Sequence, residues 1–382
     1  MYSLADYGQM TADRIRTSAY WDALRLSVNS DTVVLEIGTG FGSLALLACR
    51  AGAKRVYAVE PDDAIQLAKQ IAAQNGYEDR VQLIQAESTK ISLPEKVDLV
   101  VSDLRGVLPL FRDHIPTIID ARQRLLSPNG KLIPRQDTLW AAIVEAPDLY
   151  RHYEEPWRQN NLGLNLKHGE RFAKNSWRKG RVTIDALLAD PIRWATLDYQ
   201  VIKSPDVSFD GQLVVERSGT GHGLNIWFDT TLIEGVTFSN GPEAPELVYR
   251  SAFFPWLDPV PLKKGDVIKL YLSADLVGED YVWCWNTEVF AGGDVGASKA
   301  NFKQSTFFGV PLSPRKLAQQ ELSYQPKLNE NGNVTSFILQ AMDGQLSLEQ
   351  LAERVVERFP AKYANSREAL RDINEVAQKY SG

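Results

Sequence analysis

The glycine-rich segment VVLEIGTGFGSLALLACRAGAKRVYAVEP, residues 33–61, constrains the fold of this chain more than any other part of it. The apolar run Val33–Ile37 leads into three closely spaced glycines, a helical stretch follows, and a second apolar run ends at Glu60. Short runs rich in valine are typical of buried parallel strands. Glycine permits the tight turn that joins such a strand to a helix. The segment predicts a β-α-β unit whose loop approaches a ligand closely.

The same alternation of apolar strands and helical stretches continues to about residue 134. It predicts an α/β fold with a doubly wound, Rossmann-like sheet. From residue 136 to 311, short alternating strands separated by Gly, Pro and Asp indicate an antiparallel β-barrel, interrupted by a polar arm near residues 155–179. A connector and a small helical module complete the chain. We therefore expect three domains, comprising residues 1–135, 136–311 and 312–382.

The acids around the glycines indicate which ligand the loop holds. In the dinucleotide fingerprint Gly-x-Gly-x-x-Gly, pyrophosphate lies at the helix N-terminus. Here the third glycine comes one residue too early, and Glu36 would repel a pyrophosphate. Glu60 ends the second strand, where a carboxylate accepts hydrogen bonds from both hydroxyls of a ribose. A ligand with an ammonium group, a ribose and no phosphate is S-adenosylmethionine. A purely structural turn and a phosphate-bearing dinucleotide are the alternatives.

Several motifs extend this interpretation by resemblance. The segments 36–42 and 59–61 closely resemble the first two motifs of class I methyltransferases, and residues 10–24 resemble the N-terminal helix of protein arginine methyltransferases. The likeness covers about residues 5–290 and implies that S-adenosylmethionine is converted to S-adenosylhomocysteine. It implies that Arg16 binds the cofactor carboxylate and that Met10 lies over the cofactor. The other cofactor-binding candidates are Glu36, Gly38, Thr39, Gly40, Gly42, Glu60, Pro61, Glu87, Ser88 and Ser102.

The residues expected at the methyl acceptor depart from the pattern of that family. The family holds a guanidinium with two acids on the loop after the fourth strand; here the first is Asp103 and the second position holds Arg112. A one-residue slip would bring Asp113 into reach instead. Tyr249 stands where the family has the histidine of a Thr-His-Trp motif. These four residues are the catalytic candidates, and Arg105 and Arg112 are expected to place positive charge beside the acceptor.

We therefore expect an acceptor other than an ordinary protein arginine, such as a carboxylate, a hydroxyl or an amide-like nitrogen. Asp103 would accept a hydrogen bond or a proton from it. Two alternatives are open at this point. One is arginine N-methylation that uses Asp103 and Asp113. The other is an inactive scaffold that binds the cofactor or a peptide.

The C-terminal segment, residues 329–382, indicates which kind of substrate the protein uses. It resembles the helical part of PqqD-like modules, which bind leader segments of ribosomally made peptides, and it contains the capping-box pattern Ser347-Leu348-Glu349-Gln350. The resemblance implies a peptide or peptide-like substrate, as in natural-product biosynthesis, brought in by its leader. A plain packing or dimer helix bundle is the alternative, and a homodimer is among the expected partners.

Composition excludes several other classes of function. The net charge of −6 gives no reason to expect nucleic acid, and no apolar run reaches the roughly 20 residues that span a bilayer. Four scattered histidines show no metal-ligand spacing, so no metal site is expected. The two cysteines lie far apart on apolar segments, and the N-terminus has no signal-peptide pattern. Buried free thiols and a cytoplasmic location are the expectation.

Overall fold

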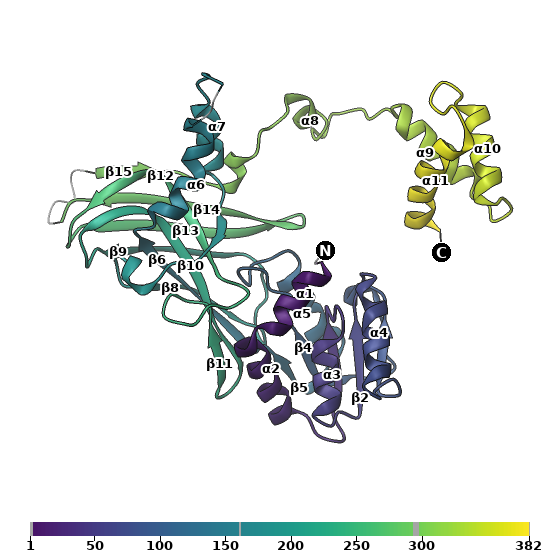
Figure 1. Ribbon diagram of the computed structural model, residues 1–382, viewed down its shortest axis with the longest axis horizontal. Coiled ribbons are helices and arrows are strands. Elements are labelled where there is room, and N and C mark those ends of the chain that lie inside the picture. The colour runs from purple at the N-terminus through teal and green to yellow at the C-terminus, as the bar shows by residue number, and fades with distance from the viewer. Residues whose placement is uncertain (1–2, 160–161, 293–297, 382) are drawn as a thin grey trace. The chain divides into compact units, whose positions relative to one another are not determined.

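The computed structural model (Figure 1) describes residues 3–159, 162–292 and 298–381. The chain divides into two compact units, Met1–Pro311 and Leu312–Gly382. Each unit has its own cluster of buried apolar side chains. The further division of the first unit at residue 135 stays a prediction.

The first part of the larger unit is a parallel sheet with helices around it, as expected. Its strand order is β3-β2-β1-β4-β5, and all neighbouring strands pair in parallel. All five residues of the central strand β1 are buried, which explains its almost wholly apolar sequence. The strands are β1 Val33–Ile37, β2 Arg55–Val59, β3 Val81–Ile84, β4 Val97–Ser102 and β5 Leu126–Ile133. The helices are α1 Leu4–Ala12, α2 Arg14–Ser27, α3 Ser43–Arg50, α4 Ala64–Gln74, the 3-10 helix η1 Ser88–Lys90, and α5 His114–Arg124.

Two antiparallel sheets follow and form the expected barrel-like region. One has the order β7-β12-β10-β6-β8 with β11 paired to β10, and the other has the order β15-β14-β13-β9. The indole of Trp285 donates to the Pro255 carbonyl at 3.0 Å and so links the two sheets. The strands are β6 Gln136–Val144, β7 Arg178–Gly180, β8 Ile192–Asp198, β9 Val207–Val214, β10 Gly219–Ile233, β11 Val236–Ser239, β12 Ser251–Leu262, β13 Val267–Val277, β14 Asp280–Phe290 and β15 Ser298–Phe302. Two 3-10 helices, η2 Ile184–Ala186 and η3 Thr306–Gly309, complete the region.

The arm between β6 and β7 consists of two helices, α6 Pro147–Arg158 and α7 Lys167–Ala173. It begins earlier than the sequence pattern suggested, because Pro147 occupies the first helical position and Tyr150 and Tyr153 pack into a small apolar cluster with Phe253. The buried Lys174 ammonium holds the arm together. It donates to carboxylate oxygens of Glu154 and Glu170 and to the Leu257 carbonyl.

The smaller unit contains four helices among its described residues: α8 Pro314–Ala318, α9 Glu330–Ala341, α10 Leu348–Arg358 and α11 Ser366–Tyr380. The expected capping box is confirmed, because Ser347 and Gln350 satisfy each other's backbone N–H groups at the start of α10. Buried Val334, Ile338 and Ile373 contribute to a core of its own. Nowhere in the described chain is a helix both long and apolar enough to cross a bilayer.

Candidate active site

The glycine loop between β1 and α3 has the backbone conformation that its sequence predicts. Gly38, Gly40 and Gly42 have φ angles of 73°, 53° and 92°, in the left-handed region that disfavours side chains. A Cβ atom at Gly40 would lie 2.7 Å from the ring of Tyr7. One at Gly38 would collide with Leu104, which follows β4. Helix α1 and the loop after β4 therefore both close over the glycine loop.

We expect Gly40→Ala to weaken S-adenosylmethionine binding about tenfold or more. A left-handed alanine costs about 1–2 kcal/mol, and the added methyl group must also displace Tyr7. Calorimetric titration with the cofactor measures the change in affinity. Gly76→Ala is the matched control, because Gly76 has φ 69° but open space around its Cβ position. A Gly40→Ala variant that binds the cofactor as well as Gly76→Ala would contradict the role given to this loop.

Glu36 supports the loop with one of its two carboxylate oxygens. Its Oε2 accepts hydrogen bonds from the Thr39 hydroxyl and, at 2.7 Å, from the Ala45 backbone N–H at the start of α3. Burial raises the pKa of Glu36 to about 7, although the bonds from Thr39 and from backbone N–H groups oppose this rise. The sequence suggested that Glu36 faces a cationic ligand. In the structure Glu36 holds the loop through the Thr39 hydroxyl and the Ala45 N–H, and its contact with a cationic ligand stays a prediction.

Glu60, at the carboxyl end of β2, fits the role of a ribose-binding acid. Its Oε2 accepts from the Gly40 N–H at 2.9 Å, and its Oε1 accepts from the Asp62 N–H at 3.1 Å. An ionised carboxylate accepts about four hydrogen bonds, so each oxygen retains capacity for one ribose hydroxyl. Glu60 is 9 % exposed, while the adjacent Pro61 lies on the surface. This donor and acceptor set, with the glycine cradle, fits S-adenosylmethionine.

The remaining cofactor candidates differ in their surroundings. Ser88 is buried at the start of η1, whereas the Glu87 side chain is 55 % exposed and pairs with Lys90 at 3.0 Å. The Ser102 hydroxyl is buried and has no hydrogen-bond partner among the described residues. The half-buried Met10 lies near Arg16, whose Nη1 donates to the Met10 carbonyl at 3.5 Å. Ser88 and Ser102 are therefore better placed than Glu87 for a buried ligand.

Arg16, Asp103 and Tyr249 come together from α2, the loop after β4 and the segment before β12. The Nε and Nη2 atoms of Arg16 lie 2.6 Å and 2.5 Å from Oδ2 of Asp103. The Tyr249 hydroxyl donates to the same oxygen and accepts from Arg16 Nε at 3.0 Å. Burial favours a higher pKa for Asp103, but Arg16 and Arg105 outweigh it and lower the pKa to about 2. Asp103 is therefore an ionised carboxylate at any physiological pH.

Arg105 donates a hydrogen bond to the other carboxylate oxygen of Asp103. Its Nε donates to Asp103 Oδ1 at 3.1 Å, and its Nη1 donates to Asp137 Oδ1 at 3.0 Å. The side chains of Arg105 and Asp137 are completely buried. The buried cluster thus contains two arginines, Arg16 and Arg105, and two aspartates, Asp103 and Asp137.

The structure does not bring Arg112 or Asp113 to Asp103. Both are exposed, and no contact of their side chains with Asp103 is found among the described residues. Arg112 has a left-handed backbone with φ 43°, and its guanidinium lies over the Phe111 ring at 5.4 Å. Asp113 precedes α5, and its charge adds to the effects of burial and Asp206 that raise the pKa of Tyr281. Of the two arginines in the loop after β4, Arg105 lies beside Asp103 and Arg112 does not.

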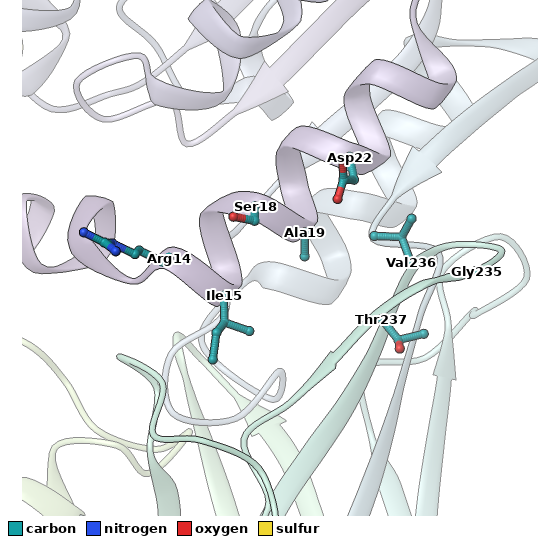
Figure 2. Close-up of a pocket in the computed structure, with 8 residues that line it drawn as sticks. All are labelled: Arg14, Ile15, Ser18, Ala19, Asp22, Gly235, Val236 and Thr237. Carbon is teal, nitrogen blue, oxygen red and sulfur yellow. The ribbon is translucent and has the colours of Figure 1, made fainter.

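A shallow surface hollow lies between α2 and the β10–β11 turn (Figure 2). Its lining residues are Arg14, Ile15, Ser18, Ala19, Asp22, Gly235, Val236 and Thr237. None of them is a predicted site residue, and those that belong to α2 lie on a different face of that helix from Arg16 and Tyr20. This hollow is separate from the cluster around Asp103.

Three residues of the site, Tyr7, Asp137 and Thr230, are not among those predicted from the sequence. Tyr7 lies against the glycine loop and makes an edge-to-face contact with Phe41, the two ring centroids being 5.5 Å apart. Asp137 and Thr230 are directly paired on neighbouring strands β6 and β10. Asp137 stands between Gln136 and Thr138 at the polar start of β6, so no local pattern marks it as a buried charge that needs a partner.

Comparison with known proteins identifies the family to which the chain belongs. Residues 34–130 match a family model described as a methyltransferase domain, and residues 135–277 match one described as an arginine methyltransferase oligomerization subdomain. Protein arginine N-methyltransferase 6 of Xenopus tropicalis is 30% identical over 257 residues, covering 63% of this chain and 75% of the relative. Protein arginine N-methyltransferase 1 of Schizosaccharomyces pombe is 29% identical over 272 residues, covering 68% and 79%.

Solved structures show the same fold. The Trypanosoma brucei PRMT1 enzyme-prozyme heterotetrameric complex with AdoHcy has a TM-score of 0.70 and 22% identity, over 78% of this chain and 96% of that chain. Protein arginine methyltransferase 10 of Arabidopsis thaliana also has a TM-score of 0.70, with 20% identity over 79% and 97%. The chain is an S-adenosylmethionine-dependent methyltransferase and belongs to the protein arginine N-methyltransferase family.

Proposed function

We propose that this methyltransferase acts on a peptide or peptide-like acceptor whose reacting atom is not an ordinary arginine nitrogen. The observation that carries the proposal is the charge balance at Asp103. Both of its oxygens are engaged by arginines of the chain itself, and the position of a second acid holds the exposed Arg112. A guanidinium acceptor is positively charged and is recognised by carboxylates that are free to pair with it. A cluster of two arginines and two aspartates offers no such excess of negative charge.

The basicity of the surrounding groups favours an acceptor that needs no deprotonation. The pKa of Asp103 is lowered to about 2, which makes it a weak base at neutral pH. Burial lowers the pKa of His114 to about 4, and its Nδ1 already bonds to the Pro109 carbonyl at 2.9 Å. Burial raises the pKa of the Tyr249 hydroxyl, which stays protonated. Among a carboxylate, a hydroxyl and an amide-like nitrogen, the carboxylate already carries its reactive lone pair.

The proposed roles of the residues follow from this arrangement. The cofactor supplies a methyl group on a sulfonium, and its transfer to an acceptor oxygen breaks the sulfur–carbon bond and leaves S-adenosylhomocysteine. Glu60 holds the ribose, and Arg16 holds the cofactor carboxylate with its remaining N–H groups. Asp103 keeps Arg16 and Arg105 in place as a fixed negative charge. The contribution of the protein is then mainly positioning, which is a large effect in a displacement reaction.

Arginine N-methylation is the second candidate function, and the names of the relatives favour it. It would use Asp103 and Asp113, so the loop between them would have to change its conformation to bring Asp113 inward. The acceptor experiment below separates the two candidates.

Two partners are proposed as well: a peptide leader and a second copy of the chain. Residues 329–382, which contain a core of their own, would bind the leader of a peptide substrate. The subdomain matched over residues 135–277 is described by its role in oligomerization, which supports a homodimer. A cytoplasmic location stays a prediction.

The acceptor is identified by the chemical stability of the product. The full-length protein is incubated with methyl-labelled S-adenosylmethionine and peptide pools that contain either arginine or acidic residues as the sole candidate acceptors. We expect label in the acidic pool that is released as methanol by mild base, as for a methyl ester. Label that survives acid hydrolysis and elutes as N-methylarginine would refute the proposal and establish the second candidate.

A further inference from the structure

The guanidinium of Arg105 is enclosed by polar partners that match its shape. Among the described residues it makes four hydrogen bonds, which engage all three of its nitrogens. Its Nε and Nη1 donate to the carboxylates of Asp103 and Asp137, and Nη1 also donates to the Thr230 hydroxyl. Its Nη2 lies 2.6 Å from the Tyr20 hydroxyl. These bonds use four of the five N–H groups of the guanidinium, which are fixed in one plane.

Aromatic rings surround the same guanidinium. Its central carbon lies 5.3 Å, 5.4 Å and 5.6 Å from the ring centroids of Phe228, Phe238 and Tyr249. The Tyr20 ring is 6.0 Å away. These distances are within the range of cation–π attraction, which is strongest where water is excluded. Carboxylates at the edge and rings against the face make up a complete binding site for a guanidinium.

The position of this cage in the fold is that of a substrate-binding site. Asp103 follows directly after β4, at the carboxyl edge of the parallel sheet where ligands of such sheets bind. The cage residues come from α2, the loop after β4, β6, β10, β11 and the segment before β12, so both the part with the parallel sheet and the barrel-like region contribute. Arg105 is only two residues beyond Asp103, and its side chain turns back into the cage.

We propose that Arg105 is a built-in occupant of a guanidinium-binding site and determines which acceptors this methyltransferase excludes. An arginine side chain of a substrate cannot enter the cage while the guanidinium of Arg105 fills it. This inference rests on the proposed function, because it gives the reason why an arginine acceptor is rejected. Truncation of Arg105 leaves Asp103 and Asp137 beside an aromatic cavity, and an external guanidinium should then bind there.

The test is rescue by free guanidinium ion. We expect low millimolar guanidinium chloride to raise the thermal unfolding midpoint of full-length Arg105→Ala. The guanidinium ion should bind about tenfold more tightly to this variant than to the unsubstituted protein. Urea has the same planar shape without the charge and should not raise the unfolding midpoint of Arg105→Ala. Arg193→Ala, which removes an exposed arginine on β8, is the matched control and should show no gain in binding. An Arg105→Ala variant that binds guanidinium no better than this control overturns the proposal.

A second measurement covers the case in which Arg105→Ala does not fold. The folded, unsubstituted protein is treated with phenylglyoxal, which modifies accessible arginines, and the products are mapped by mass spectrometry. We expect the exposed Arg112 to react and Arg105 to remain unmodified until the protein is unfolded. Reaction of both residues at the same rate in the folded protein overturns the proposal. Neither measurement requires S-adenosylmethionine or an acceptor, so a failure of the proposed methyl transfer would be seen separately.

Discussion

Replacement of Glu60 by alanine is expected to weaken S-adenosylmethionine binding about 100-fold. Each hydrogen bond to a charged group contributes about 1.5–3 kcal/mol, and about 1.4 kcal/mol corresponds to a factor of ten in affinity. The variant loses the proposed acceptor of both ribose hydroxyls. It also loses the bond that Oε2 of Glu60 accepts from the Gly40 N–H, which helps to hold the glycine loop. Isothermal titration calorimetry with the cofactor measures the loss directly.

Two controls separate the ribose contact from general damage. Glu60→Gln keeps one acceptor oxygen and the side-chain length. Its affinity for S-adenosylmethionine should therefore lie between that of the alanine variant and that of the unsubstituted protein. Glu95→Ala removes a half-buried acid that accepts from Arg55, at the opposite end of β2, and from the Tyr57 hydroxyl, and it should leave cofactor affinity unchanged. If Glu60→Ala binds S-adenosylmethionine within threefold of Glu95→Ala, the ribose role of Glu60 is wrong.

Asp103→Asn is expected to reduce turnover about 100-fold or more while it preserves cofactor binding. The substitution removes the negative charge between Arg16 and Arg105, and the asparagine amide can accept from only one of the two guanidinium groups. A shift of reacting groups by about 1 Å costs about 100-fold in rate. The charge of Arg16 becomes less compensated, so its attraction for the cofactor carboxylate does not fall. Steady-state kinetics and calorimetry give the two quantities.

The same substitution has a cost in stability that must be measured beside the rate. Loss of one partner from a buried ion pair costs about 3–5 kcal/mol, so the unfolding midpoint should fall. Tyr249→Phe is the control, because it removes the hydroxyl that donates to Oδ2 of Asp103 but leaves every charge in place. It should retain more activity and more stability than Asp103→Asn. Equal loss of cofactor binding in Asp103→Asn and Glu60→Ala would refute the separate roles of these two acids.

The cofactor half of the site was predictable because its chemistry depends on local backbone geometry. Gly38, Gly40 and Gly42 lie within five residues of one another, and their left-handed conformations follow from the strand-to-helix turn itself. Glu60 is about one β-α-β unit away, and parallel pairing of β1 with β2 necessarily brings it to the loop.

The acceptor half was less predictable because its residues are distant in the sequence. Arg112 follows Asp103 at the spacing expected for the second acid, yet it is exposed, whereas Arg105 is buried at the carboxylate. Which of the two arginines turns inward depends on Asp137 and Thr230, which β6 and β10 supply from the barrel-like region. No local pattern around residue 105 contains that information.

The amino-acid sequence alone therefore determined the family, the parallel sheet and the methyl donor, because strand pattern, glycine spacing and the acid at residue 60 act over short distances along the chain. Only the tertiary structure decided what surrounds Asp103. Burial makes the electrostatic free energy of that carboxylate depend on every charge within a few ångströms. Those charges come from helix α2, from the loop after β4 and from strand β6, which only folding brings together.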